Sequence, residues 1–292
     1  MDSQTGSVQL PDHRRLSYEL SGHVAGPVVI LSNSLLTSVR LWDIFVDDLH
    51  QKGFRVLRYD QPGHGSSSVP EDPTQTTFLT LSADVKTLLD RLQIAQVYAW
   101  VGISMGAAKG AFFVTQYPGV VAKLVLCDTI SCSPQNAGIA DPFAARVALA
   151  REKATAIDEL TEQTLGRWFQ EDWRREHADE TARMRAAMRV TRPGGFIACC
   201  NALQHQSFDL KPLMPKIGAC VQSVLVVVGE LDADLPISMA AMKDEIERTS
   251  ASPVDMVIIP RAGHVPVVDG REVFTEKVMA FLGSPSLRDS KV

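Results

Sequence analysis

The sequence predicts an α/β fold, in which a doubly wound, mostly parallel sheet carries a helical insert. The first reason is a set of short, continuously apolar runs, which are typical of strands buried on both faces. The second is that helical patterns alternate with these runs, as they do where crossover helices join parallel strands. The third is the segment 131–220, where the alternation stops and several helical patterns follow one another.

Each element can be placed from these patterns. Residues 7–20 alternate and turn at 11–13, which predicts a starting hairpin. The expected strands are 27–32, 54–59, 96–101, 123–128, 223–228 and 254–259. The expected helices are 42–51, 80–92, 107–113, 236–248 and 272–282, with four more at 142–156, 157–173, 177–190 and 194–206. We therefore expect residues 1–130 and 221–292 to form the core and residues 131–220 to form a helical cap.

Composition restricts the partners. The chain has 292 residues, of which 45% are apolar, so it can bury a sizeable core. Its net charge is −5 and no run of Lys or Arg stands out, which argues against nucleic acid and membrane as partners. No signal peptide or membrane span is expected, and the five cysteines lack the spacing of zinc ligands. We expect a cytoplasmic protein with buried free thiols, a small-molecule substrate and no metal or cofactor.

A candidate nucleophile lies in the segment Gly102-Ile103-Ser104-Met105-Gly106, which reads G-x-S-x-G. A β-rich run precedes this segment, and a small-residue helical pattern follows it. Strand, sharp turn and helix are the context of a nucleophile elbow. Glycines two residues before and after Ser104 remove side chains where the strand and the helix crowd together. The segment therefore predicts a serine whose hydroxyl is lifted out of the sheet.

Two later residues complete a candidate triad. A serine hydroxyl is a weak nucleophile at neutral pH and needs a base that is oriented by an acid. In folds with this motif the chain order is Ser, acid, His. Asp232 and His264 each follow a late strand, so both are expected at the edge of the sheet that holds Ser104. Asp234 is the alternative acid, and His64, in a glycine-rich turn, is expected to make structural hydrogen bonds.

Ester cleavage also needs donors for the developing oxyanion, and backbone amides supply them. One donor should be the amide after the nucleophile, that of Met105. The other should come from the loop that follows the strand 27–32, and Leu35 is the expected residue in that loop.

Further stretches match a known family. They are Leu31-Ser32-Asn33-Ser34-Leu35, Trp42-Asp43, Arg58-Tyr59-Asp60, Gly63-His64-Gly65, Arg167-Trp168-Phe169 and the run from Gly195 to Cys200, together with the G-x-S-x-G segment. With them the chain from about 7 to 284 resembles the α/β-hydrolase superfamily and, within it, the 3-oxoadipate enol-lactonase family. The resemblance implies the α/β-hydrolase fold. Two stretches depart from the family: Leu36 stands where it has Gly, and residues 265–268 read Val-Pro-Val-Val.

These observations predict a serine hydrolase that cleaves a small ester or lactone through an acyl-enzyme. One alternative is a carbon–carbon bond hydrolase or a biosynthetic hydrolase of the same fold, and another is a non-hydrolytic ligand-binding relative. In the cap, Trp168 and Phe196 are expected to form apolar walls of the substrate pocket, and Arg167 is a candidate carboxylate clamp. The alternative for the two aromatic residues is that they only pack the cap helices together.

Overall fold

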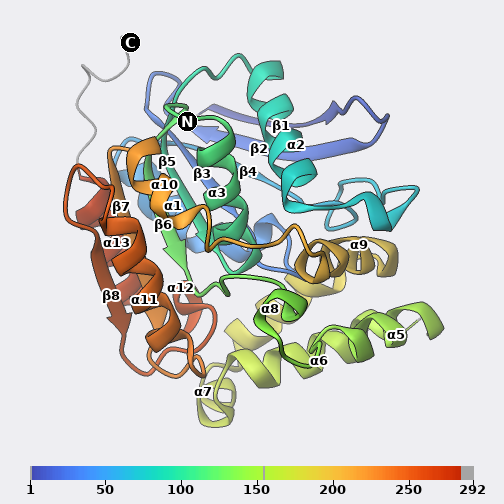
Figure 1. Ribbon diagram of the computed structural model, residues 1–292. Helices are drawn as coiled ribbons and strands as arrows, with labels where there is room; N and C mark the ends of the chain where they lie inside the picture. Colours follow the sequence, from blue (N-terminus) through green and yellow to red (C-terminus); the bar gives the residue numbers. More distant parts are fainter. Residues whose placement is uncertain (1, 154, 284–292) are drawn as a thin grey trace.

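The computed structural model describes residues 2–153 and 155–283, and eight strands in this part form one sheet (Figure 1). The strands are β1 (Asp2–Gln9), β2 (Arg15–Gly22), β3 (Val28–Ser32), β4 (Arg55–Tyr59), β5 (Val97–Ile103), β6 (Val121–Cys127), β7 (Ser223–Gly229) and β8 (Asp255–Ile259). They lie in the order β1-β2-β4-β3-β5-β6-β7-β8, and all pairs from β4 to β8 are parallel. The starting hairpin and the six later strands are confirmed, although β8, at the edge of the sheet, is partly exposed.

Helices cover both faces of this sheet. Those of the core are α1 (Asp43–Gln51), α2 (Phe78–Arg91), α3 (Met105–Gln116), α10 (Met214–Cys220), α11 (Leu235–Glu247), α12 (Pro266–Asp269) and α13 (Arg271–Leu282), with the 3-10 turns η1 (Val39–Trp42) and η2 (Pro73–Gln75). The connection from β3 through α1 runs toward β2, whereas those through α2 and α3 run the other way. Because parallel crossovers are right-handed, α1 lies on one face and α2 and α3 lie on the other. The predicted doubly wound α/β fold is confirmed.

The direction of winding changes between β3 and β5, which are neighbours in the sheet. The loops that leave their carboxyl ends therefore diverge, one toward each face, and α/β sheets form their sites at such a switch point. Leu35 lies in the loop after β3, and Ser104 lies in the turn after β5. The topology alone thus places these two predicted site residues at the carboxyl ends of neighbouring strands.

The segment between β6 and β7 is helical, but its helices differ from the expected four. They are α4 (Pro134–Ala137), α5 (Ala144–Glu152), α6 (Ala156–Trp168), α7 (Glu171–Glu176), α8 (Ala178–Arg189) and α9 (Pro193–Gln204), before α10. The single helix predicted over 157–173 is wrong, because Phe169 and Gln170 are extended and separate α6 from α7. The helix α10 was not predicted, and it packs on α3 and α11 of the core.

The helices α5–α9 cover the loops at the carboxyl edge of the sheet, and Figure 1 shows α5, α6, α7 and α8 grouped at one end of the molecule. The Ser38 amide, after β3, donates to the carbonyl of Ala187 on α8 at 3.2 Å. The Arg192 amide, before α9, donates to the carbonyl of Gly63, after β4, at 2.8 Å. We use the term cap for α5–α9.

Among the described helices, none combines the length and the apolar character that a membrane crossing requires. All five cysteines are free, and only Cys220 is partly exposed.

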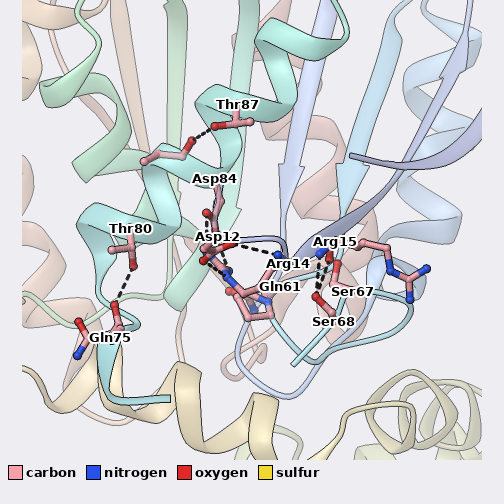
Figure 2. A network of polar contacts seen from close by, with 12 residues as sticks. Asp12, Arg14, Arg15, Gln61, Ser67, Ser68, Gln75, Thr80, Asp84 and Thr87 are labelled. Carbon is pink, nitrogen blue, oxygen red and sulfur yellow. Dashed lines mark hydrogen bonds and ion pairs between the residues drawn. The ribbon is translucent and has the colours of Figure 1, made fainter. Parts of the chain in front are cut away.

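Polar contacts fasten the first hairpin to the core (Figure 2). The Arg14 guanidinium donates two hydrogen bonds to the Asp84 carboxylate on α2, at 2.7 and 2.8 Å. The Ser67 hydroxyl oxygen accepts a hydrogen bond from the Ser17 amide on β2, at 2.8 Å. Burial raises the pKa of Asp84 even though Arg14 favours its ionised form. The pair therefore carries a desolvation cost, which its mutual contact and the ion pair of Arg14 with Asp12 offset.

A second network joins the loops that follow β3 and β4. The buried His64 ring accepts a hydrogen bond at Nε2 from the Leu36 amide at 3.0 Å, and its Nδ1 donates to the Pro62 carbonyl at 2.9 Å. These bonds select the neutral imidazole, and burial lowers the pKa of His64 to about 4. The prediction that His64 makes structural hydrogen bonds is confirmed.

The side chain of Lys109, on α3, lies beneath the same loops and is 1% exposed. Its Nζ donates to the Tyr59 hydroxyl at 3.1 Å and to the Gln61 side-chain oxygen at 3.0 Å. Gln61 in turn donates to the carbonyl of Ser34, at 3.0 Å. Burial lowers the pKa of Lys109 to about 8. This chain of contacts ties the loop after β3 to the helix that follows Ser104.

Replacing Arg14 by Met should destabilise the fold by about 3–5 kcal/mol, because the Asp84 carboxyl stays buried and loses its cation. Urea unfolding at neutral pH measures the change. The matched control is Arg15→Met, which removes an exposed side chain with no ion pair to another described residue, and it should stay within about 0.5 kcal/mol of the wild type. Similar losses in the two variants would contradict the role of the pair.

Acidification should destabilise the fold through His64. Its pKa is about 4 in the folded chain, against an ordinary value of 6.5. Because the folded value is the lower one, the stability is complete above pH 6.5 and is lost as the pH falls through 4, by about 3 kcal/mol in all. The variant His64→Gln cannot take up this proton. Its free energy of unfolding should fall less steeply than that of the wild type between about pH 7.5 and pH 4.5, and parallel curves would refute this origin.

Candidate active site

Ser104 lies in a strained turn between β5 and α3. Its backbone angles are φ 56° and ψ −120°, in a region that residues with a side chain rarely adopt. A Cβ on Gly102 would come closer than 3.0 Å to the backbone of Gly106, and a Cβ on Gly106 would come equally close to the carbonyl of Ser32. Both glycines are therefore required by close backbone packing, and the Ser104 side chain stays partly exposed at the end of the sheet.

Asp232 and His264 meet at the same edge. Asp232 follows β7, His264 follows β8, and the His264 Nδ1 donates a hydrogen bond to Asp232 Oδ2 at 2.6 Å. The two side chains are 14% and 17% exposed. The alternative acid, Asp234, is the residue before α11 and makes no hydrogen bond to His264. Because Nδ1 carries the proton, Nε2 is left as the acceptor on the opposite side of the ring.

The backbone around His264 is fixed from two sides. The Gly263 amide donates to Asp269 Oδ2 at 2.7 Å, and the His264 amide donates to the carbonyl of Trp168 at 3.4 Å. The Trp168 ring also lies against the imidazole, with the ring centroids 5.3 Å apart and the planes at 33°. Burial raises the pKa of Asp269 to about 7. The end of α6 thus contacts the candidate base directly.

Two backbone amides are available where oxyanion donors were predicted. The amides of Leu35 and Met105 donate no hydrogen bond to any residue in 2–153 or 155–283. The Met105 amide is the first of α3, where helix geometry leaves N–H groups without an internal partner. The next residue of the loop, Leu36, has φ 68° and is held there through its bond to His64. The loop is therefore locked in a shape that leaves the amide before it unpaired.

The predicted substrate residues lie in three different settings. Trp168 is 6% exposed and touches His264, whereas Phe196 has no exposed surface. Complete burial supports the alternative that Phe196 packs the cap helices, and its contact with substrate stays a prediction. Arg167 is exposed to solvent, yet burial lowers its pKa to about 10, and the charge of Arg146 lowers it further. The Arg167 side chain is thus reached by solvent and still partly surrounded by protein.

Arg146, on α5, was not predicted to belong to the site. Its guanidinium lies 4.8 Å from the centre of the Phe143 ring, and its Nε is buried without a hydrogen-bond partner. Neither Arg146 nor Arg167 forms a salt bridge with an acid in the described residues, and burial lowers the pKa of both guanidinium groups. Asp232 is one of the charges that act on Arg167, and the charge of Arg146 acts on Arg167 in turn, so Arg146 is linked to the candidate triad through Arg167. An arginine in an amphipathic helix is usually a surface residue, and the sequence has no signal of its inward direction.

Known proteins resemble this chain over nearly its whole length. The model of the alpha/beta hydrolase fold matches residues 27–270. 3-Oxoadipate enol-lactonase 2 of Acinetobacter baylyi is 28% identical over 268 residues, which cover 91% of this chain and 92% of that protein. An enol-lactonase of Burkholderia xenovorans LB400 superposes with a TM-score of 0.81 at 29% identity, over 95% of this chain and 99% of that one. A thermophilic esterase of Thermogutta terrifontis superposes with a TM-score of 0.80 at 25% identity, over 99% and 100%.

The family match spans far more than half of the chain and includes the elbow, the acid and the histidine described above. The sheet order, the winding and the strained serine turn agree with that match. The chain therefore belongs to the α/β-hydrolase fold family.

Proposed function

We propose that this protein is a serine hydrolase that cleaves a small ester or lactone bearing a carboxylate. The observation that carries the proposal is the Asp232–His264 hydrogen bond, formed at the same edge of the sheet as the strained turn of Ser104. The enol-lactonase and esterase relatives support the bond type.

In this mechanism Ser104 attacks the carbonyl carbon while His264 Nε2 takes its proton. Asp232 holds the imidazole by Nδ1 and stabilises the imidazolium that forms. The amides of Leu35 and Met105 receive the oxyanion. His264 then protonates the leaving oxygen, and water hydrolyses the acyl-enzyme by the same steps in reverse. The Ser104 hydroxyl has no hydrogen bond to His264 in the described residues, and such contacts commonly tighten only when substrate binds.

The carboxylate on the substrate is inferred from Arg146 and Arg167. Two guanidinium groups that repel each other and have no acidic partner are unfavourable unless an anion joins them. Arginine binds a carboxylate through two parallel hydrogen bonds. Since Trp168 lies beside His264 at the end of the same helix that carries Arg167, a carboxylate bound there would hold a small substrate near Ser104.

Ser104→Ala should abolish turnover while the unfolding midpoint stays near that of the wild type. His264→Ala should cost a similar factor, and the double variant should be little worse, because residues of a triad act as a unit. Steady-state rates on a panel of small esters and lactones measure this. If Ser104→Ala kept wild-type turnover on any accepted substrate, the proposed mechanism would be wrong.

Arg146→Gln and Arg167→Gln should each lower kcat/KM for an anionic lactone by about tenfold to a hundredfold, which is the loss of a hydrogen bond to a charged group. On a neutral ester of the same size the loss should be small. Arg151→Gln, an exposed residue on the same helix as Arg146, is the matched control and should leave both substrates unaffected. Equal losses on the two substrates would show that the arginines serve the fold of the cap instead.

A further inference from the structure

A second carboxyl group lies directly behind the candidate acid. Asp128 follows β6, has no exposed surface, and adopts φ 44°. Its amide donates to the carbonyl of Val227 on β7 at 3.1 Å, and its Oδ1 accepts a hydrogen bond from the Gly229 amide at 2.9 Å. Its Oδ2 accepts one from the Cys127 thiol, also at 2.9 Å. The side chain is therefore held against the start of the loop that carries Asp232.

The Asp232 amide donates to the carbonyl of Gly229 at 3.2 Å, so Gly229 holds both acids, and the Asp128 carboxyl lies within hydrogen-bonding reach of the carboxyl of Asp232. Two ionised carboxylates have no proton between them and repel, so this contact requires one proton on the pair. Asp232 has His264 as a partner that favours its charge, whereas Asp128 has no cation within ion-pair distance among the described residues. The proton therefore belongs on Asp128.

We propose that Asp128 is a positioning residue: a neutral carboxylic acid that donates its proton to Asp232 and holds that carboxylate in line with His264. The proposal rests on the function proposed above for Asp232 and His264. Among the described side chains, His264 hydrogen-bonds the Asp232 carboxyl and Asp128 lies within reach of it, so removing Asp128 would leave one oxygen of a largely buried carboxylate without support.

The surroundings agree with a neutral acid. Burial raises the pKa of Asp128 well above its usual range, and the charge of Asp232 raises it further. Burial and the neighbouring acids likewise raise the pKa of the Cys127 thiol, so it remains a donor to Asp128. The other titratable groups around this cluster are Asp269, beside Gly263, and Arg167 on the cap. The charge of Asp232 favours a higher pKa at both.

The test compares Asp128→Asn with Asp128→Ala. The amide of Asn has the shape of the neutral acid and can donate to Asp232, so kcat should stay within about threefold of the wild type. The acidic limb of the pH profile of kcat/KM should also keep its position to within about 0.3 pH unit. Asp128→Ala should lower kcat by about tenfold to a hundredfold with little change in KM. If Asp128 were ionised, Asn would remove a negative charge beside Asp232 and shift the acidic limb to lower pH, and the proposal would fall.

A second measurement does not depend on catalysis. A carboxyl whose folded pKa is raised supports the fold fully below its unfolded value, near 4, and loses this support as the pH rises through the folded value. The unfolding midpoint of Asp128→Asn should therefore rise relative to the wild type between about pH 4.5 and pH 8. The exposed Asp255→Asn should show a constant difference. A constant difference for Asp128→Asn as well would overturn the proposal.

If Asp128→Asn did not fold, the wild type itself would answer the question. The carboxyl carbon of Asp128, observed by NMR in protein with labelled aspartate, should stay at the position of a neutral acid from about pH 4.5 to pH 8. A titration near pH 4 would overturn the proposal. These readouts are independent of Ser104, so a failure of the proposed function, seen as an active Ser104→Ala variant, can be told apart from a failure of this inference.

Discussion

The site depends on the close approach of β5, the start of α3 and the end of β3. No side chain fits at Gly102 or Gly106, because the backbones of Gly106 and Ser32 occupy the space. This contact forces the chain to reverse within one residue, and Ser104 takes the strained φ of 56°. Strain of this kind costs about 1–3 kcal/mol and persists only where the surrounding structure holds it. Here a serine with a partly exposed hydroxyl is placed above the sheet by the packing of the core.

The loop beside this turn is shaped by buried polar groups. Trp42 donates to the Asn33 side chain at 2.8 Å, and Asn33 donates to the carbonyl of Tyr59 at 3.1 Å. Both belong to the stretches that carry the resemblance to enol-lactonases, so these motifs hold the loop after β3 in place. Leu36 stands where that family has Gly, and its φ of 68° is a conformation that favours glycine. Its side chain is only 1% exposed, and burial of a leucine, at about 1.5–3 kcal/mol, offsets the strain.

Charge is separated across the candidate site. Behind the imidazole lie Asp128 and Asp269, two acids whose pKa values are raised mainly by burial. On the cap are Arg146 and Arg167, which form no salt bridge with an acid in the described part of the chain, and the charge of Asp232 acts on Arg167. Carboxyl groups can become neutral when they are buried, whereas guanidinium groups stay charged at neutral pH. An anion would therefore be attracted to the arginines of the cap, which agrees with the carboxylate proposed for the substrate.

The sequence by itself determined the strands, the parallel sheet and the edge at which Ser104, Asp232 and His264 would meet. Those features depend on local patterns, since an apolar run marks a buried strand and residues just after parallel strands share one edge. Only the tertiary structure decided that His264 pairs with Asp232 and not with Asp234, that α6 ends at Trp168, and that Arg146 turns inward. It also revealed Asp128, which lies 104 positions before its partner Asp232 in the chain. Such features depend on the burial of side chains between distant elements, and no local pattern of residues carries that information.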